Sequence, residues 1–119
     1  MLNLDTHILI HALSGELSRR ERHLLSGHQW SISAIVLWEL SKLSQLGRIT
    51  LDIASPELAL ALSKIQIWPL DLAVCRAIHR LDFRSDPADE IIAATSLVHN
   101  VPLLTRDRQI LKSRSVPLA

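Results

Sequence analysis

Short apolar segments alternate with longer amphipathic segments along the whole chain. The first apolar segment, Leu2–Leu4, ends abruptly in Asp5-Thr6-His7 and is followed at once by a second apolar run. This pattern predicts a strand that turns into a helix at Asp5. Further strands are expected at 29–32, 67–70, 101–105 and 115–118, with 48–53 as a connector or short extended segment. Helices are expected at 6–12, 16–26, 34–46, 56–65, 72–81, 87–99 and 107–112.

The alternation of strands and helices predicts one α/β domain, residues 1–119, with a mainly parallel central sheet. Ser33 and Asp86 are the expected N-caps of two helices, and Asn100 is an expected left-handed stop. Pro56 fits the first turn of a helix. Because Pro69 has no backbone N–H to donate, its strand is expected at an edge of the sheet.

Composition narrows the classes of function. Only 3% of the residues are aromatic, which argues against a base-stacking platform for single-stranded nucleic acid. With only 3 glycines, the chain has neither a Walker loop nor a G-x-G-x-x-G turn. The single cysteine, Cys75, excludes an internal disulfide and fits a reducing cytoplasm. No signal peptide is expected, since Asp5 interrupts the first apolar segment, and no apolar run is long enough to span a membrane.

Four acidic residues stand where the carboxyl ends of parallel strands would gather them, namely Asp5, Glu39, Asp89 and Asp107. Two of them follow predicted strands, whereas Glu39 and Asp89 lie in helices among mostly apolar neighbours. A buried carboxylate must pair, bind a cation or take up a proton, because burial of an unpaired charge is costly. A salt bridge from Glu39 to Lys42 and an N-cap role for Asp107 are the structural alternatives.

Carboxylates within a few ångströms of each other repel and are stable together only with cations or captured protons. Hard oxygen ligands that leave coordination positions open suit Mg²⁺ or Mn²⁺. Such a centre contacts phosphate oxygens and activates water for in-line attack. The hydroxyls of Thr6 and Thr105 are placed to orient ligands or that water. A phosphodiester is therefore the expected substrate class.

Other chemistries have weaker support in the sequence. His7 and His11 have the spacing of a zinc pair on one helix face, but no third nitrogen or sulfur ligand accompanies them. No G-x-S-x-G motif supports Ser-His-Asp catalysis. Cys75 lies among small and aliphatic residues, and we interpret it as a core residue rather than a nucleophile.

Four short segments carry a family resemblance. They are Leu4-Asp5-Thr6-His7, Ser33–Leu40, Asp86-Pro87-Ala88-Asp89 followed by Ile91–Thr95, and Leu103–Asp107. In this order, and spread over nearly the whole chain, they resemble the PIN domain of the VapC-like toxins. That family comprises small endoribonucleases of prokaryotic type II toxin–antitoxin systems.

The resemblance implies a PIN-like fold, with three α/β/α layers, and places the family's acidic site on the same four acids. Asp5 and Asp89 would be the principal Mg²⁺ ligands, and Asp107 a further direct or water-mediated ligand. Glu39 would act through bound water or a second ion. The family's supporting hydroxyls match Thr6 and Thr105.

One position departs from the family pattern. Many relatives carry Arg after the third acid, whereas this chain has Glu90. The departure affects a local ion pair or substrate contact but leaves all four acids in place.

Residues and resemblance together predict a Mg²⁺-dependent endoribonuclease that acts as a toxin. Arg84, Arg106 and Arg108 are candidate phosphate contacts, with a solvated basic face as the alternative. The expected partners are RNA, a small antitoxin and a second copy of the chain, which would contact apolar faces near Trp38 or on the helix at 58–65. A PIN nuclease of RNA processing and a non-catalytic binding module are the alternatives for function.

Overall fold

Four strands form a single sheet with the order β3-β2-β1-β4, and each neighbouring pair runs parallel. In the computed structural model, which describes residues 1–119, the strands are β1 (Leu2–Leu4), β2 (Trp30–Ser33), β3 (Gln66–Trp68) and β4 (Leu103–Leu104). The helices are α1 (Thr6–Ser14), α2 (Arg19–Ser26), α3 (Ala34–Gln45), α4 (Pro56–Ser63), α5 (Leu72–Ala77), the 3₁₀ helix η1 (Ile78–Arg80), α6 (Pro87–His99) and α7 (Arg108–Leu111). The predicted α/β class with a parallel sheet is confirmed.

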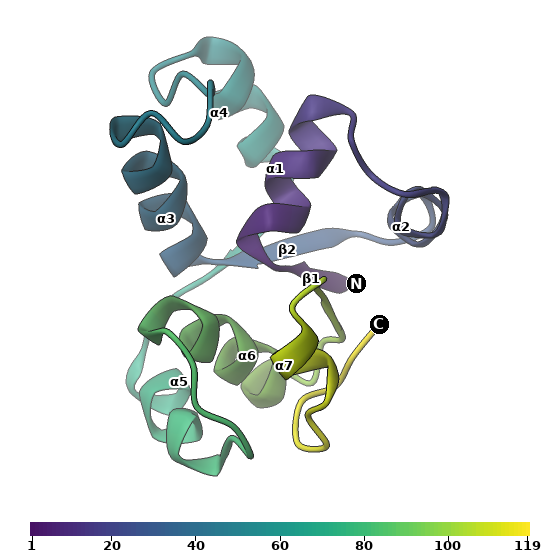
Figure 1. Cartoon of the computed structure of the whole chain (residues 1–119), viewed down its shortest axis with the longest axis vertical. Helices are drawn as coiled ribbons and strands as arrows, with labels where there is room; N and C mark the ends of the chain where they lie inside the picture. Colours follow the sequence, from purple (N-terminus) through teal and green to yellow (C-terminus); the bar gives the residue numbers. More distant parts are fainter.

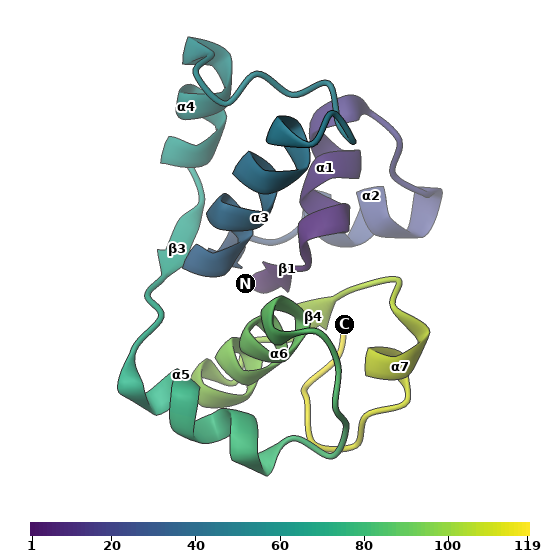
Figure 2. The same ribbon diagram turned by 60° about the vertical axis from the view of Figure 1, so that its left-hand side comes forward.

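Helices cover both faces of the sheet and give the predicted three layers. Helices α1, α3 and α4 lie on one side, and α5, α6 and α7 lie on the other (Figures 1 and 2). The chain runs outward from β1 to β2 and β3, then crosses to β4 on the opposite side of β1. The strand order therefore reverses between β1 and β4. In open parallel sheets, ligands bind at such a switch point, beyond the carboxyl ends of the strands.

The core lies between the sheet and the helices that flank it. Its largest fully buried apolar side chains come from the strands and from α1, α3, α5, α6 and α7, and they are Leu4, Ile8, Leu9, Ile32, Val36, Leu40, Val74, Ile92, Leu103, Leu104 and Ile110. Burial of one such side chain contributes about 1.5–3 kcal/mol. This packing fixes α1, α3 and α6 against the sheet, and these are helices that carry or follow candidate acids.

Asn3 is a polar residue inside this core. Its side chain is fully buried, and Nδ2 donates to the Ser96 hydroxyl at 2.9 Å and to the Ile92 carbonyl at 3.4 Å. A buried amide must find such partners, because its hydration is lost on folding. The two bonds join β1 to α6, so the helix sits in a fixed register on the strand that ends at Asp5.

Most of the predicted helix boundaries are confirmed. The Ser33 hydroxyl accepts a bond from the Ile35 N–H at 3.3 Å, and Pro56 occupies the first turn of α4. Asn100 ends α6 in the left-handed conformation with φ 51°. Asp86 occupies the N-cap position of α6 as predicted, but its side chain accepts no bond from the helix.

The two predicted helices that differ most from the structure are the second helix and the helix from Leu72, and both are shorter. The second helix begins at Arg19, because Ser18 and Glu21 form a capping box in which each side chain accepts a bond from the other's backbone N–H. The helix from Leu72 changes after Ala77 into the tighter 3₁₀ turn of η1. None of the helices is both long and apolar enough to cross a bilayer.

The strands also differ in length from the prediction. The segment 101–105 pairs as a strand only at Leu103–Leu104, and the segment 115–118 contributes one parallel bridge, from Leu118 to Leu103. Residues 48–53 form turns and irregular structure rather than a strand. Strand β3 lies at an edge of the sheet, as its following proline predicts. Cys75 is exposed on α5, so the prediction that it belongs to the core was wrong.

An ion pair between a buried carboxylate and a partly exposed guanidinium ties α2 to the segment that follows β4. The Arg106 guanidinium donates to both carboxylate oxygens of Glu21, from Nε at 2.8 Å and from Nη2 at 2.7 Å. The Glu21 side chain is 8% exposed. Mainly because of the bonds from Arg106, and partly those from Ser18, the pKa of Glu21 is lowered to about 2 from an ordinary 4.5. The ionised pair holds the chain just before Asp107.

We expect Glu21→Gln to lower the free energy of unfolding at pH 7 by about 1–3 kcal/mol, because the charge-assisted bonds from Arg106 to the buried carboxylate are weakened. A lowered pKa means that the stabilisation is complete above pH 4.5 and is lost as the pH falls towards 2. Urea unfolding of both proteins at pH 7 and pH 2.5 measures this, with the exposed Glu57→Gln as control. If Glu21→Gln lowers the free energy of unfolding by the same amount at both pH values, the ion-pair interpretation is contradicted.

Candidate active site

Asp5 lies at the junction of β1, β4 and α1. It is the N-cap of α1, and its carboxylate accepts bonds from the Thr6 N–H (2.7 Å) and from the Thr105 hydroxyl (2.6 Å). The residue is 6% exposed. Each carboxylate oxygen has further lone pairs, so both remain able to coordinate a cation. The Thr105 bond joins the ends of β1 and β4 across the switch point.

Glu39 reaches the same place from α3. Its Oε1 accepts a bond from the Thr6 hydroxyl at 2.5 Å, and its Oε2 accepts none. The alternative salt bridge to Lys42 does not form, since that ammonium donates to Gln45 at 2.9 Å. The backbone and the side chain of Thr6 therefore bond to two different acids, Asp5 and Glu39.

Asp89 lies on the face of α6 that packs against the sheet. Ile92, Ala93 and Ser96, which follow it at helical spacing, are fully buried. The Asp89 carboxylate is only partly exposed, and its Oδ2 accepts a bond from the Ser85 hydroxyl at 3.0 Å. Its Oδ1 accepts no hydrogen bond.

Asp107 has the capping role that was its structural alternative, and it also lies near the other acids. Its Oδ1 accepts bonds from the backbone N–H groups of Gln109 (2.9 Å) and Ile110 (3.1 Å) at the start of α7. Its own N–H donates to the Thr105 hydroxyl at 3.0 Å, and its Oδ2 accepts no hydrogen bond. Thr105 therefore connects Asp107 to Asp5.

The other three acids act electrostatically on Asp89. The pKa of Asp89 is raised from 3.8 to about 6, mainly because burial disfavours its charged form. The Ser85 hydroxyl opposes this shift, whereas the negative charges of Asp5, Asp107 and Glu39 add to it. Asp5, Glu39 and Asp107 therefore all lie close enough to Asp89 for their charges to affect its pKa.

The donor set fits a hard divalent cation. All donors are carboxylate or hydroxyl oxygens, and three of the four acids have an oxygen without a hydrogen bond. As they stand, no three acidic, histidine or cysteine side chains are close enough to enclose a metal ion. Carboxylates repel one another without a cation, and Mg²⁺ keeps several of its waters when it binds. Water-mediated coordination suits this spacing.

The predicted phosphate contacts have different environments. Arg106 uses Nε and Nη2 in its ion pair with Glu21, and its side chain is 43% exposed, so its role as a phosphate contact stays a prediction. Arg84 and Arg108 are exposed and form no ion pair. The Arg84 carbonyl accepts a bond from Gln109 Nε2 at 2.6 Å, which places this arginine beside α7.

Sequence reasoning missed Ser85 and gave Glu90 no role. Ser85 bonds to two acids, through its hydroxyl to Asp89 and through its N–H to Glu90 at 3.2 Å. Nothing in the local sequence distinguishes this serine from an ordinary turn residue, because both contacts depend on how the chain enters α6.

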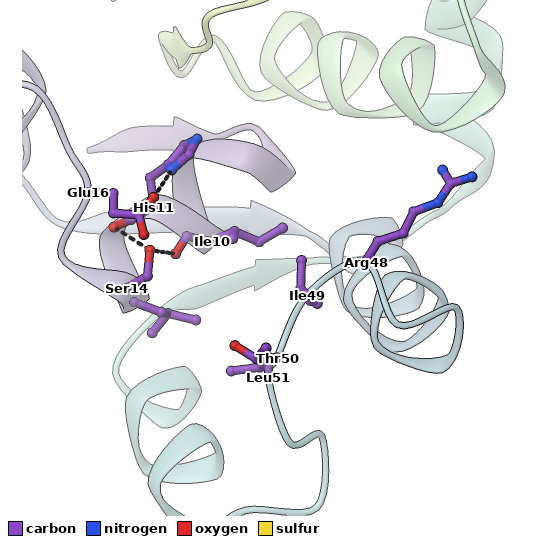
Figure 3. A pocket seen from close by; sticks show the side chains of 9 residues that line it. Ile10, His11, Ser14, Glu16, Arg48, Ile49, Thr50 and Leu51 are labelled. Carbon is purple, nitrogen blue, oxygen red and sulfur yellow. Dashed lines mark hydrogen bonds and ion pairs between the residues drawn. The ribbon is translucent and has the colours of Figure 1, made fainter.

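A cavity of about 470 Å³ lies away from the acids, between the end of α1 and the segment 48–51 (Figure 3). His11 and Glu16 line it, with Nδ1 and Oε2 3.6 Å apart. No acid of the candidate site is among the lining residues, so the cavity is not the expected site of chemistry. His7 is exposed and forms no metal-binding group with His11, so the structure gives no support to a zinc pair.

The fold and site define a parallel α/β domain with an acidic centre at its switch point. The family model of the PIN domain matches residues 3–114. The chain therefore belongs to the PIN domain family, as its sequence motifs predicted. Sequence comparison with curated proteins gives no match.

Solved structures of VapBC and FitAcB have chains with a similar fold. A chain of VapBC2 from Rickettsia felis, bound to a DNA fragment from their promoter, has a TM-score of 0.73 at 20% identity over 100% of this chain and 98% of that one. A chain of DNA-bound VapBC from Salmonella typhimurium has a TM-score of 0.69 at 21% identity, over 100% of this chain and 98% of that one. A chain of FitAcB from Neisseria gonorrhoeae has a TM-score of 0.68 at 24% identity, over 99% of this chain and 96% of that one. At these identities the likeness concerns the fold.

We expect Asp89→Asn to raise the free energy of unfolding at pH 7.5 in EDTA by about 1–2 kcal/mol. The pKa of Asp89 is raised to about 6 in the folded chain. The contribution of this carboxyl group to stability is therefore highest below pH 3.8 and is lost as the pH rises through 6. The asparagine side chain of the variant cannot ionise, so it avoids this loss at pH 7.5. At pH 3.5 the Asp89 carboxyl group is protonated, and the stability difference between variant and wild type should vanish. Urea unfolding at both pH values measures it, with the exposed Asp52→Asn as control. Destabilisation at pH 7.5 would instead identify Asp89 as a structural partner.

Proposed function

We propose that this chain is a Mg²⁺-dependent endoribonuclease and the toxin of a type II toxin–antitoxin pair. The observation that carries the proposal is the convergence of four carboxylates at the switch point of a PIN domain. A bound Mg²⁺ or Mn²⁺ would supply a water of lowered pKa and neutralise charge on the phosphodiester. Asp5, Asp89 and Asp107 are the residues that would hold the ion.

The remaining site residues orient these groups. The Thr6 hydroxyl donates to one oxygen of Glu39, so the other oxygen is free to accept a proton or a bond from the attacking water. The Thr105 hydroxyl donates to Asp5 and so fixes the orientation of that carboxylate. Together the two threonines keep both acids available as acceptors.

RNA is the proposed substrate, and its backbone would be the main contact. Arg84 and Arg108 are exposed cations on the segments beside Asp89 and Asp107. Phosphate contacts position a nucleic acid without reading its sequence, so these arginines support binding rather than base specificity. A PIN nuclease of RNA processing would use the same residues. A non-catalytic module is disfavoured, because none of the four acids is replaced.

An antitoxin and a second copy of the chain are the proposed protein partners, in a reducing compartment such as the cytoplasm. The solved structures with this fold are toxin–antitoxin complexes. Large apolar side chains lie open on α3 and α4, with Trp38 57% and Leu60 61% exposed. Trp38 and Ile53 line a groove of about 440 Å³. Such an apolar surface supports a protein contact.

We expect the purified chain to cleave RNA with Mg²⁺ or Mn²⁺ and to lose cleavage in EDTA. Asp5→Asn should reduce the rate by at least about 100-fold, because it removes a charged ligand of the proposed ion. The assay is gel analysis of mixed RNA, with the exposed Asp52→Asn as the matched control.

Cleavage that survives EDTA or Asp5→Asn would refute the proposed site. Single- and double-stranded DNA of the same length in parallel assays would separate ribonuclease from deoxyribonuclease activity. Co-expression with the product of a short adjacent reading frame tests the toxin role. If no neighbouring product binds the chain and blocks cleavage, an RNA-processing nuclease becomes the better assignment.

A further inference from the structure

The loop before α6 is joined to the acidic site through Ser85. The Ser85 hydroxyl donates to Asp89 Oδ2 at 3.0 Å, and its backbone N–H donates to Glu90 Oε2 at 3.2 Å. Asp86 makes no side-chain bond to the first turn of α6, although it occupies the N-cap position. Glu90 therefore fixes the entry of the chain into this helix by reaching back to Ser85.

The same loop is also fastened to α7, which Asp107 caps. Gln109 donates from Nε2 to the Arg84 carbonyl at 2.6 Å and from its backbone N–H to Asp107 Oδ1 at 2.9 Å. Two proposed metal ligands, Asp89 and Asp107, are thus joined through one continuous set of contacts. The loop lies between them and sets their relative position.

A second attachment holds the beginning of the loop. Asp82 accepts bonds from the hydroxyls of Ser113 (2.6 Å) and Ser115 (2.7 Å) and from the Arg114 N–H (2.7 Å). These bonds hold the pKa of Asp82 well below its ordinary range, so this carboxylate stays ionised and bonded. With both ends attached, the loop has little freedom to withdraw Ser85 from Asp89.

We propose that Ser85 is a positioning residue that orients the Asp89 carboxylate for the metal ion, and that Glu90 holds Ser85 in place. The inference rests on the proposed function, since it concerns the same site. Oδ2 accepts the Ser85 bond, so Oδ1, which accepts none, would be the oxygen that holds the ion. Hydrogen-bond partners of metal ligands typically contribute about 10–100-fold in metal affinity or activity.

The test measures Mn²⁺ affinity of the full-length chain by isothermal titration, together with RNA cleavage and urea unfolding in EDTA. Ser85→Ala removes the hydroxyl, and Ser85→Thr keeps it. Glu90→Ala removes the acceptor, and Glu90→Gln keeps an oxygen that can accept the Ser85 N–H. Controls are Ser63→Ala, whose exposed hydroxyl bonds only within α4, and Glu57→Ala, which removes an acid from another helix that starts with proline.

We expect Ser85→Ala and Glu90→Ala to weaken Mn²⁺ binding by at least about fivefold. The conservative variants Ser85→Thr and Glu90→Gln should bind Mn²⁺ with an affinity close to that of the wild type. A purely structural role would lower the free energy of unfolding without changing the affinity of the folded protein. Affinity of Ser85→Ala within fivefold of the wild type, or no recovery in Ser85→Thr, would overturn the inference. A wild-type chain that binds no Mn²⁺ and cleaves no RNA would refute the proposed function and this inference together.

Discussion

Burial of Asp89 beside three other carboxylates is the constraint on which this site depends. Asp89 takes a raised pKa of about 6 because burial and the charges of three other acids disfavour its ionised form. The chain offsets this repulsion with neutral donors instead of buried cations, since the Thr6, Thr105 and Ser85 hydroxyls each donate to an acid. Neutral donors leave the net negative charge in place, and that charge attracts a divalent cation.

The topology of the sheet places the backbone positions of these acids near one another. Strand order reverses between β1 and β4, so the residues that follow these two strands are neighbours. The Asn3 amide then fixes α6 on β1 through Ser96, and the face of α6 that carries Asp89 points towards the strand ends. The ion pair of Glu21 with Arg106 secures the segment before Asp107 from the other side. These polar bonds thus serve the geometry of one site.

Sequence alone predicted the parts of this arrangement that depend on local pattern. The strand that ends at Asp5, the helix from Pro87 to His99 and its left-handed stop at Asn100 all follow from apolar periodicity and capping chemistry. The roles that depend on distant contacts were not predictable. The pairing of Arg106 with Glu21 spans 85 positions, and exposure of Cys75 depends on which face of α5 meets α6. The Ser18-x-x-Glu21 capping box is a local signal that the sequence contains and that was missed.

The central claim is that Asp5, Asp89 and Asp107 hold one divalent cation at the switch point, with Glu39 close by. Crystals grown near neutral pH and soaked in Mn²⁺ test this most directly, because manganese is identified by its anomalous scattering. We expect an anomalous peak bonded, directly or through water, to carboxylate oxygens of these three aspartates. A peak on other residues only, or no peak at millimolar Mn²⁺, would contradict it.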